Sequence, residues 1–121
     1  MKNLIIDAAN DKIVFEIITS KQSYTSSYIN SRENFDKFMK LLIDFFNKIK
    51  FKIVDIDRIY VHLGPGKFTS LRISLSIAKA ISLVNNATLV GFKSKDLINK
   101  NYKNLIKLEK NKSLIKPIYS S

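Results

Sequence analysis

The chain has 121 residues, of which 45% are hydrophobic and 26% are charged, with only three Gly and two Pro. This composition predicts a single folded domain of helices and strands and excludes a disordered chain. No apolar run approaches the roughly 18 residues that span a bilayer. Asp7 interrupts the first hydrophobic stretch too early for a signal peptide, so we expect a cytoplasmic protein with no membrane association.

Few side chains suit covalent or metal chemistry. The sequence contains no Cys and a single His, His62. Disulfides and thiol catalysis are therefore excluded, and a zinc site is disfavoured. We expect no metal site, and any chemistry would have to use carboxylates, hydroxyls and lysines.

The formal net charge of +11 invites a nucleic-acid partner, and residues 93–116 carry eight Lys against Asp96 and Glu109. Only three of the 21 basic residues are Arg, whereas sites that read phosphates or bases usually favour the Arg fork. Two interpretations stay open: a basic contact surface, or a solvated face in a Lys-rich sequence.

Three strands and a helix are predicted in the first half. Apolar or alternating runs at 3–9, 12–19 and 22–29, the first two joined by the turn-like "NDK", predict an antiparallel meander. A helix over 31–49 follows, with Ser31 as its N-cap and apolar residues at helical spacing.

The second half predicts a strand at 56–64, a helix at 69–86 that ends at an Asn pair, and a strand at 87–92. This strand–helix–strand order implies a parallel pair with a right-handed crossover. A third helix is expected over 95–108, and Pro117 favours an edge or terminal strand in the final segment. The fold class is therefore α/β, with a mixed five-stranded sheet and flanking helices.

The loop in "HLGPGKFTSLR" (62–72) looks like a phosphate-binding loop, but its spacing fits neither the P-loop nor the dinucleotide fingerprint. It suits a sharp strand-to-helix turn, in which both glycines take positive φ and Thr69 or Ser70 caps the helix. Weak candidates for cofactor binding are Asp7, Gly64 and Gly66; we expect no cofactor.

The helix after this loop has two stripes. Small residues recur at Ser70, Ser74 and Ala78, which lets another backbone come close. A bulky stripe of Ile73, Ile77, Ile81 and Val84 lies on another side. We expect a second helix to cover this helix, from 32–49 of the same chain, from a partner, or from both, with the small stripe meeting the partner.

The segment "GPGKFTSLRISLSIAKAIS" resembles the "GPGSFTGLRIG…AKGLA" signature of the bacterial TsaB (YeaZ) family, and similar segments precede and follow it. The matching positions are Gly64, Pro65, Gly66, Phe68, Thr69, Leu71, Arg72, Ile73, Ala78 and Lys79. Lys67, Ser70 and Ser74 depart from the signature. Family members also carry a second, similar domain, so the resemblance predicts one actin-like domain over 1–98 and a Lys-rich linker and tail over 99–121.

The resemblance implies an actin-like, ribonuclease H-like fold and a non-catalytic subunit. It would be required for threonylcarbamoyladenosine (t6A) formation next to the anticodon of tRNAs that read codons beginning with adenine. The implied partner is the TsaD transferase, with the ATPase TsaE assisting. The resemblance also implies that the chain forms a homodimer when alone and contacts tRNA only indirectly. The implied interface lies on the two helices: Phe35, Phe38, Met39, Leu42, Ser70, Arg72, Ile73, Ser74, Ile77, Ala78 and Ile81.

Two other functions stay open. One is a Lys-rich RNA-binding module, although no aromatic stacking platform accompanies the charge. The other is an enzyme, either a residual actin-like ATPase or the peptidase once attributed to relatives of the family; the single His and the broken glycine motif argue against it.

Overall fold

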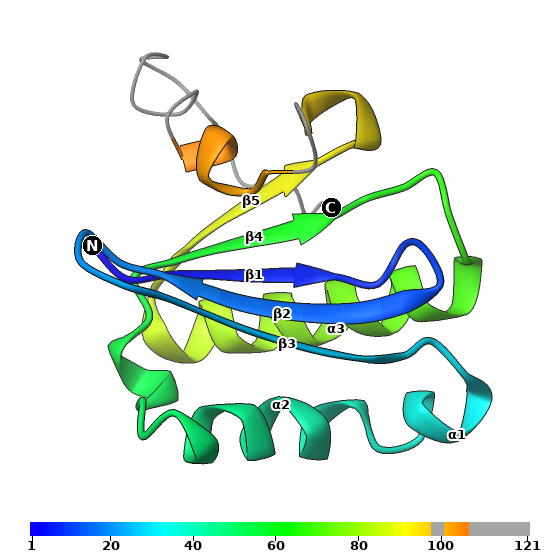
Figure 1. The fold of residues 1–121 in the computed structure, drawn as a ribbon, viewed down its shortest axis with the longest axis horizontal. Coiled ribbons are helices and arrows are strands. Elements are labelled where there is room, and N and C mark those ends of the chain that lie inside the picture. Colours follow the sequence, from blue (N-terminus) through cyan, green and yellow to red (C-terminus); the bar gives the residue numbers. More distant parts are fainter. Residues whose placement is uncertain (98–100, 107–121) are drawn as a thin grey trace.

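A computed structural model describes residues 1–97 and 101–106. Its elements, in chain order, are β1 (Asn3–Asp7), β2 (Lys12–Ile18), β3 (Ser23–Ile29), α1 (Arg32–Phe35), α2 (Phe38–Lys48), η1 (Ile53–Asp55), β4 (Arg58–His62), α3 (Phe68–Asn85), β5 (Thr88–Phe92) and η2 (Ser94–Asp96). Figure 1 shows the sheet with α2 and α3 along one face. The chain is thus an α/β domain, as the sequence predicts.

The strand order in the sheet is β3-β2-β1-β4-β5. The meander β1-β2-β3 is antiparallel, while β1 and β5 both pair parallel with β4. β1 is buried at every position, as expected for a strand with neighbours on both sides. The five-stranded mixed sheet is confirmed, with each strand within two residues of its predicted bounds.

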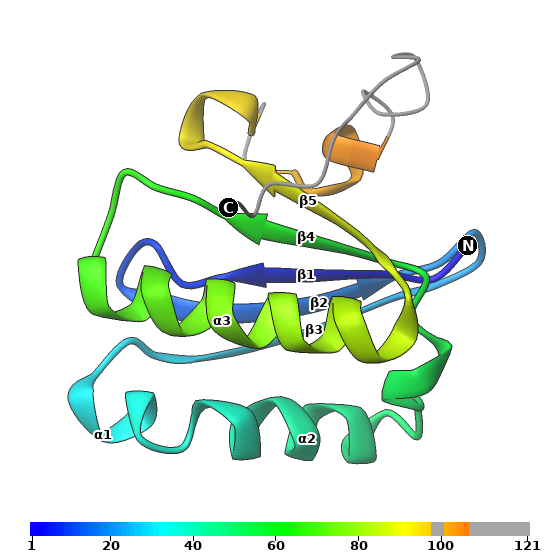
Figure 2. The ribbon, with the colours of Figure 1, turned by 180° about the vertical axis from the view of Figure 1, so that it is seen from behind.

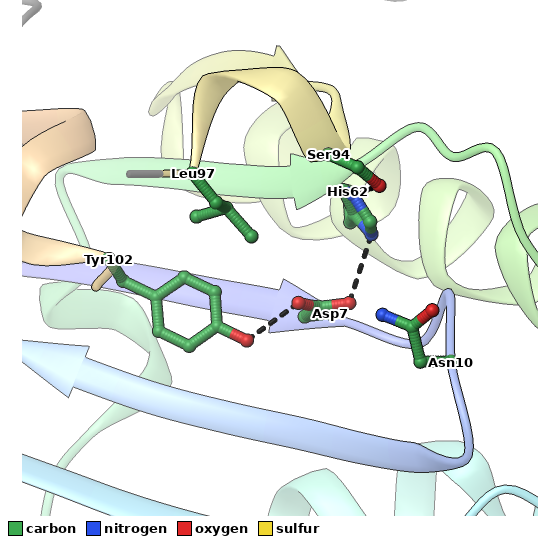
Figure 3. A pocket seen from close by; sticks show the side chains of 6 residues that line it. All are labelled: Asp7, Asn10, His62, Ser94, Leu97 and Tyr102. Carbon is green, nitrogen blue, oxygen red and sulfur yellow. Dashed lines mark hydrogen bonds and ion pairs between the residues drawn. The ribbon is translucent and has the colours of Figure 1, made fainter. Parts of the chain in front are cut away.

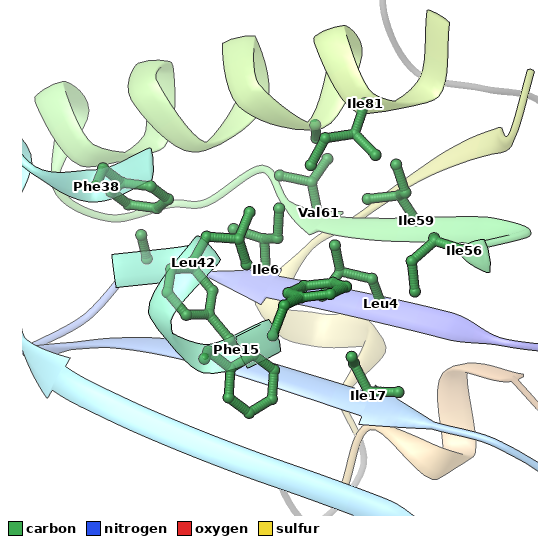
Figure 4. Close-up of a cluster of buried hydrophobic side chains, with 14 of the residues drawn as sticks. Leu4, Ile6, Phe15, Ile17, Phe38, Leu42, Ile56, Ile59, Val61 and Ile81 are labelled. Carbon is green, nitrogen blue, oxygen red and sulfur yellow. The ribbon is translucent and has the colours of Figure 1, made fainter. Parts of the chain in front are cut away.

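The main core fills the space between the sheet and the two helices. Phe15 on β2 lies at its centre, with its ring 5.5 Å from that of Phe38 and 6.1 Å from that of Phe45, both on α2. Figure 4 shows these apolar side chains converging from strands and helices. Close packing of branched and aromatic side chains on one face accounts for the pattern that predicted both helices.

A smaller core covers the other face of the sheet. Ile5, Tyr60 and Phe92 point to that side, where Tyr102 and Leu105 pack against them. Figure 2 shows η2 and the short helical turn at residues 103–106 on the side of the sheet away from α2 and α3. One face of the sheet is therefore covered by α2 and α3, and the other face by the segment that carries Tyr102 and Leu105.

Three local predictions need correction. The helix expected over 31–49 is broken: Ser31 does cap α1, accepting from Asn34 N at 3.3 Å, but Lys37 leaves helical geometry at φ −121° before α2 begins. α1 contains no buried residue whereas α2 buries five, so core packing fixes the direction of α2 alone.

The helix expected over 95–108 is also wrong at its start. Ser94–Asp96 form a 3-10 turn, Leu97 is extended at ψ 102°, and helical geometry returns at 103–106. Residues 98–100 and the final segment with Pro117 lie outside the described residues.

α3 begins at Phe68 with Lys67 at its N-cap, where no side chain caps it, so the expected cap by Thr69 or Ser70 is wrong. Ser70 Oγ instead donates to the carbonyl of Ala8 at 2.7 Å and ties the helix to the end of β1. The predicted end of α3 is confirmed, because Asn86 turns left-handed at φ 55°.

Candidate functional site

A pocket of about 340 Å³ opens where three parallel strands end. Asp7 is the last residue of β1, His62 is the last residue of β4, and Ser94 follows β5 by two residues. Asn10, Leu97 and Tyr102 complete the lining. Ligands of open α/β sheets commonly bind at the carboxyl ends of strands, so this is the candidate site.

The polar side chains of the pocket form a chain of close contacts (Figure 3). Ser94 Oγ lies 3.1 Å from His62 Nε2, and His62 Nδ1 lies 3.1 Å from Asp7 Oδ1. The second contact is close but poorly aligned, so the buried Nδ1 has no hydrogen bond of good geometry. Tyr102 Oη donates to the other carboxylate oxygen of Asp7 at 2.6 Å.

Asp7 is buried, yet its surroundings hold the pKa of its carboxyl below the ordinary range. Burial by itself raises its pKa. The contact and charge interaction with His62, together with the hydrogen bonds from Tyr102 and Ala9 N, lower the pKa below its ordinary value of 3.8. The pKa of Tyr102 is raised, first by burial and then by its bond to the Asp7 carboxylate. The pocket therefore holds the Asp7 carboxylate in contact with two side chains, His62 and Tyr102.

The glycine loop packs against the chain instead of lining this pocket. Gly64 has φ 106°, as predicted, but Gly66 has no positive φ; it is needed because a Cβ there would lie 2.2 Å from the carbonyl oxygen of Ala9. Lys67 N donates to that same oxygen at 3.0 Å, and Lys67 Nζ reaches the carbonyl of Asn30 at 3.3 Å. Of the weak cofactor candidates, only Asp7 lines the pocket.

The small stripe of α3 faces the chain's own sheet. Ser70, Ser74 and Ala78 are all 0% exposed, which corrects the expectation that this stripe meets a partner. Small side chains let α3 lie close to β1, β4 and β5, and a bulky stripe could not do so. Three other residues of the predicted interface are buried in the same core: Phe38, Leu42 and Ile81.

The opposite side of α3 is the one that solvent reaches. Ser76 and Ala80 are exposed at its centre, and Leu83 and Val84, at 79% and 81% exposure, lie toward its end. Phe68 is exposed at its start, with the Arg72 guanidinium 5.2 Å from the centre of its ring. Of the remaining predicted interface residues, Met39 and Arg72 are exposed, while Phe35, Ile73 and Ile77 are half-buried.

Sequence reasoning missed the grouping of Asp7, His62 and Ser94. The available signal was that Asp7 and His62 lie near the ends of the predicted strands at 3–9 and 56–64, and that Ser94 follows the predicted strand at 87–92. Only the last two strands were predicted as a parallel pair, and the parallel pairing of β1 with β4 brings Asp7 to the same edge of the sheet. Among residues 1–97 and 101–106, no three His, Asp or Glu gather as a metal site would require. No helix in that described part of the chain is long and apolar enough to cross a membrane.

The sheet order and the helices on it define the ribonuclease H-like class of α/β domains, which includes the actin-like proteins. Two solved structures share this fold. YeaZ from Pseudomonas aeruginosa superimposes with a TM-score of 0.73 at 14% identity, over 84% of this chain and 48% of that one. RuvC from Thermus thermophilus gives a TM-score of 0.54 at 6% identity, over 80% of this chain and 66% of that one.

Sequence comparison identifies the family. The family model described as TsaD, tRNA N6-adenosine threonylcarbamoyltransferase, matches residues 12–104. The tRNA threonylcarbamoyladenosine biosynthesis protein TsaB of Buchnera aphidicola (subsp. Schizaphis graminum) is 26% identical over 95 residues, which are 78% of this chain and 45% of that protein. The chain belongs to the TsaB (YeaZ) family of TsaD-like proteins. It spans about half the length of these relatives.

Proposed function

We propose that this protein is a non-catalytic subunit for t6A formation in tRNA and that it acts by binding a TsaD-type transferase. The family match over 12–104 supports the pathway, since the Buchnera relative is named for threonylcarbamoyladenosine biosynthesis. In this proposal the transferase performs the chemistry, and this chain contributes a binding surface.

The observation that carries the proposal is the outer side of α3. The small stripe of α3 packs on the sheet, and on its opposite side the helix presents Ser76 and Ala80 to solvent, between apolar residues on either flank. Arg72 lies one turn before Ser76 on this side, and the small residues that follow it suit close packing against another helix. Met39 and Ile43, at 39% and 41% exposure on α2, add apolar surface to the same helical layer.

The experiment is co-expression with the TsaD-type protein of the same genome, followed by affinity capture and size-exclusion chromatography. Ser76→Arg and Ala80→Arg place a long charged side chain at the centre of the proposed contact. Both positions are exposed, so the fold should tolerate them. Changes at an interface centre commonly cost about 2 kcal/mol or more, so we expect each variant to weaken binding by about thirtyfold or more.

Ser27→Arg is the matched control, because Ser27 is exposed on β3 and far in sequence from α3, and it should leave capture unchanged. A reconstituted t6A assay on tRNA gives the second readout and should fall in parallel with capture. Equal capture of wild-type protein and both α3 variants would overturn the assigned surface. Absence of any complex with wild-type protein would overturn the partnership itself.

A further inference from the structure

The pocket holds a serine, a histidine and an aspartate in series, and the proposed subunit role uses none of them. Ser94 Oγ is 3.1 Å from His62 Nε2, and the far side of the imidazole is 3.1 Å from Asp7 Oδ1. A hydroxyl, an imidazole and a carboxylate in this order are the parts of a nucleophilic site, recognised by geometry and not by sequence position.

The imidazole is held in place from several directions. It stacks on Phe92 with 4.8 Å between ring centres and 24° between planes, and its side chain is fully buried. Asp7 is fixed in turn by Tyr102 Oη at 2.6 Å and Ala9 N at 3.2 Å. A base whose position is set by its surroundings, with an ionised carboxylate behind it, is what proton transfer from a hydroxyl needs.

Ser94 is the accessible member of the series. It is exposed to solvent, and its backbone N–H donates to the carbonyl of Gly64 at 3.3 Å, which anchors η2 to the loop after β4. The turn is closed by Lys93 N donating to Asp96 Oδ2 at 2.8 Å. A substrate can therefore reach Ser94 Oγ while its neighbours stay fixed.

We propose that Ser94, His62 and Asp7 form a hydrolytic site that cleaves esters of small carboxylic acids. The pocket volume of about 340 Å³ suits a small acyl group, and Leu97 and Tyr102 supply an apolar wall for it. Asn10 lines the same pocket and offers an amide N–H for the oxygen that becomes negative during attack.

The reaction proceeds in two balanced halves. Ser94 Oγ bonds to the ester carbonyl carbon as His62 Nε2 takes the hydroxyl proton; the bond from that carbon to the alcohol oxygen breaks, and His62 returns the proton to the departing alcohol. Water then attacks the acyl carbon and gives its proton to His62. The bond to Ser94 Oγ breaks, Ser94 recovers the proton, and the free acid leaves. Asp7 stabilises the imidazolium that forms through its charge, because its Oδ1 lies 3.1 Å from His62 Nδ1 without an aligned hydrogen bond.

The test treats the full-length protein with a fluorophosphonate probe and locates the modified residue by peptide mass spectrometry. We expect Ser94 to be labelled and labelling to fall at least tenfold in His62→Gln, with Ser20, an exposed turn residue, as the internal comparison. Labelling of Ser94 no greater than that of Ser20 overturns the proposal. Circular dichroism checks that each variant folds; if His62→Gln does not fold, Asp7→Asn takes its place.

Turnover of p-nitrophenyl acetate gives the second readout. Because the many lysines can be acetylated once each, only product beyond that stoichiometry counts as turnover. We expect Ser94→Ala to reduce turnover by about a hundredfold, the range that a positioned base and nucleophile supply, and Ser20→Ala to leave it unchanged. Asp7→Asn should change the pH profile of turnover in addition to its rate. Equal turnover in Ser94→Ala and wild-type protein overturns the proposal.

Discussion

Gly66→Ala tests how the glycine loop is held against β1. A Cβ at this position would lie 2.2 Å from the carbonyl oxygen of Ala9 and 2.8 Å from its Cα and carbonyl carbon. Reaching even a 3.0 Å separation from the oxygen requires a movement of about 0.8 Å, and all three contacted atoms are backbone. That movement also stretches the 3.0 Å hydrogen bond from Lys67 N to the same oxygen.

The expected loss of stability combines two effects. Forcing an extra carbon into a packed site costs about 1–3 kcal/mol, and a lost backbone hydrogen bond costs about 1 kcal/mol. We therefore expect Gly66→Ala to lower the free energy of unfolding by about 2–4 kcal/mol, a large part of the 5–15 kcal/mol typical of a domain.

Urea denaturation followed by circular dichroism measures this change, with Ser76→Ala on the exposed side of α3 as the control near zero. A loss below about 0.5 kcal/mol in Gly66→Ala would refute the reasoning, because it would mean that the loop and Ala9 separate at almost no cost.

Three further predictions concern the pocket and α3. The pKa of Asp7 in the folded protein is below 3.8, so the stability that its carboxylate contributes is complete above pH 3.8 and is lost as the pH falls through the folded pKa. The difference in urea midpoint between wild type and Asp7→Asn should therefore shrink below pH 3.8. A constant difference would contradict this. Tyr102→Phe should cost about 1.5 kcal/mol of unfolding free energy through loss of its 2.6 Å bond to Asp7, and an unchanged midpoint would show that this bond is not made in solution. Ser74→Arg should lower the free energy of unfolding by about 4 kcal/mol or more, because it buries a charge at a position with 0% exposure. A soluble variant with wild-type stability would disprove this placement of α3.

The order of strands and helices was predictable from the sequence, because hydrophobic period and turn residues act over short distances. β1, β2 and the crossover around α3 follow from the runs at 3–9, 12–19 and 69–86. The break at Lys37 was not predictable, since the apolar spacing continues through it and only tertiary packing separates α1 from α2.

The side of α3 that faces the sheet was assigned wrongly because both of its stripes could be buried. Small residues at Ser70 and Ser74 permit close packing on a sheet as well as on a partner helix, and the sequence does not distinguish the two. The pocket was missed for a different reason. Asp7, His62 and Ser94 are separated by 55 and 32 positions, so only the parallel pairing of their strands brings them together.

The position of β1 in the middle of the sheet has a consequence for folding during synthesis. The ribosome releases β1, β2 and β3 first, and their antiparallel pairing needs only short loops, whereas β1 pairs with β4 across about fifty intervening residues. Until β4 emerges, the free edge of β1 keeps its backbone N–H and C=O groups unpaired and is open to pairing with other chains. We expect pulsed hydrogen exchange to protect amides of β2 and β3 before those of β4 and β5; simultaneous protection would show instead that the sheet forms in one step.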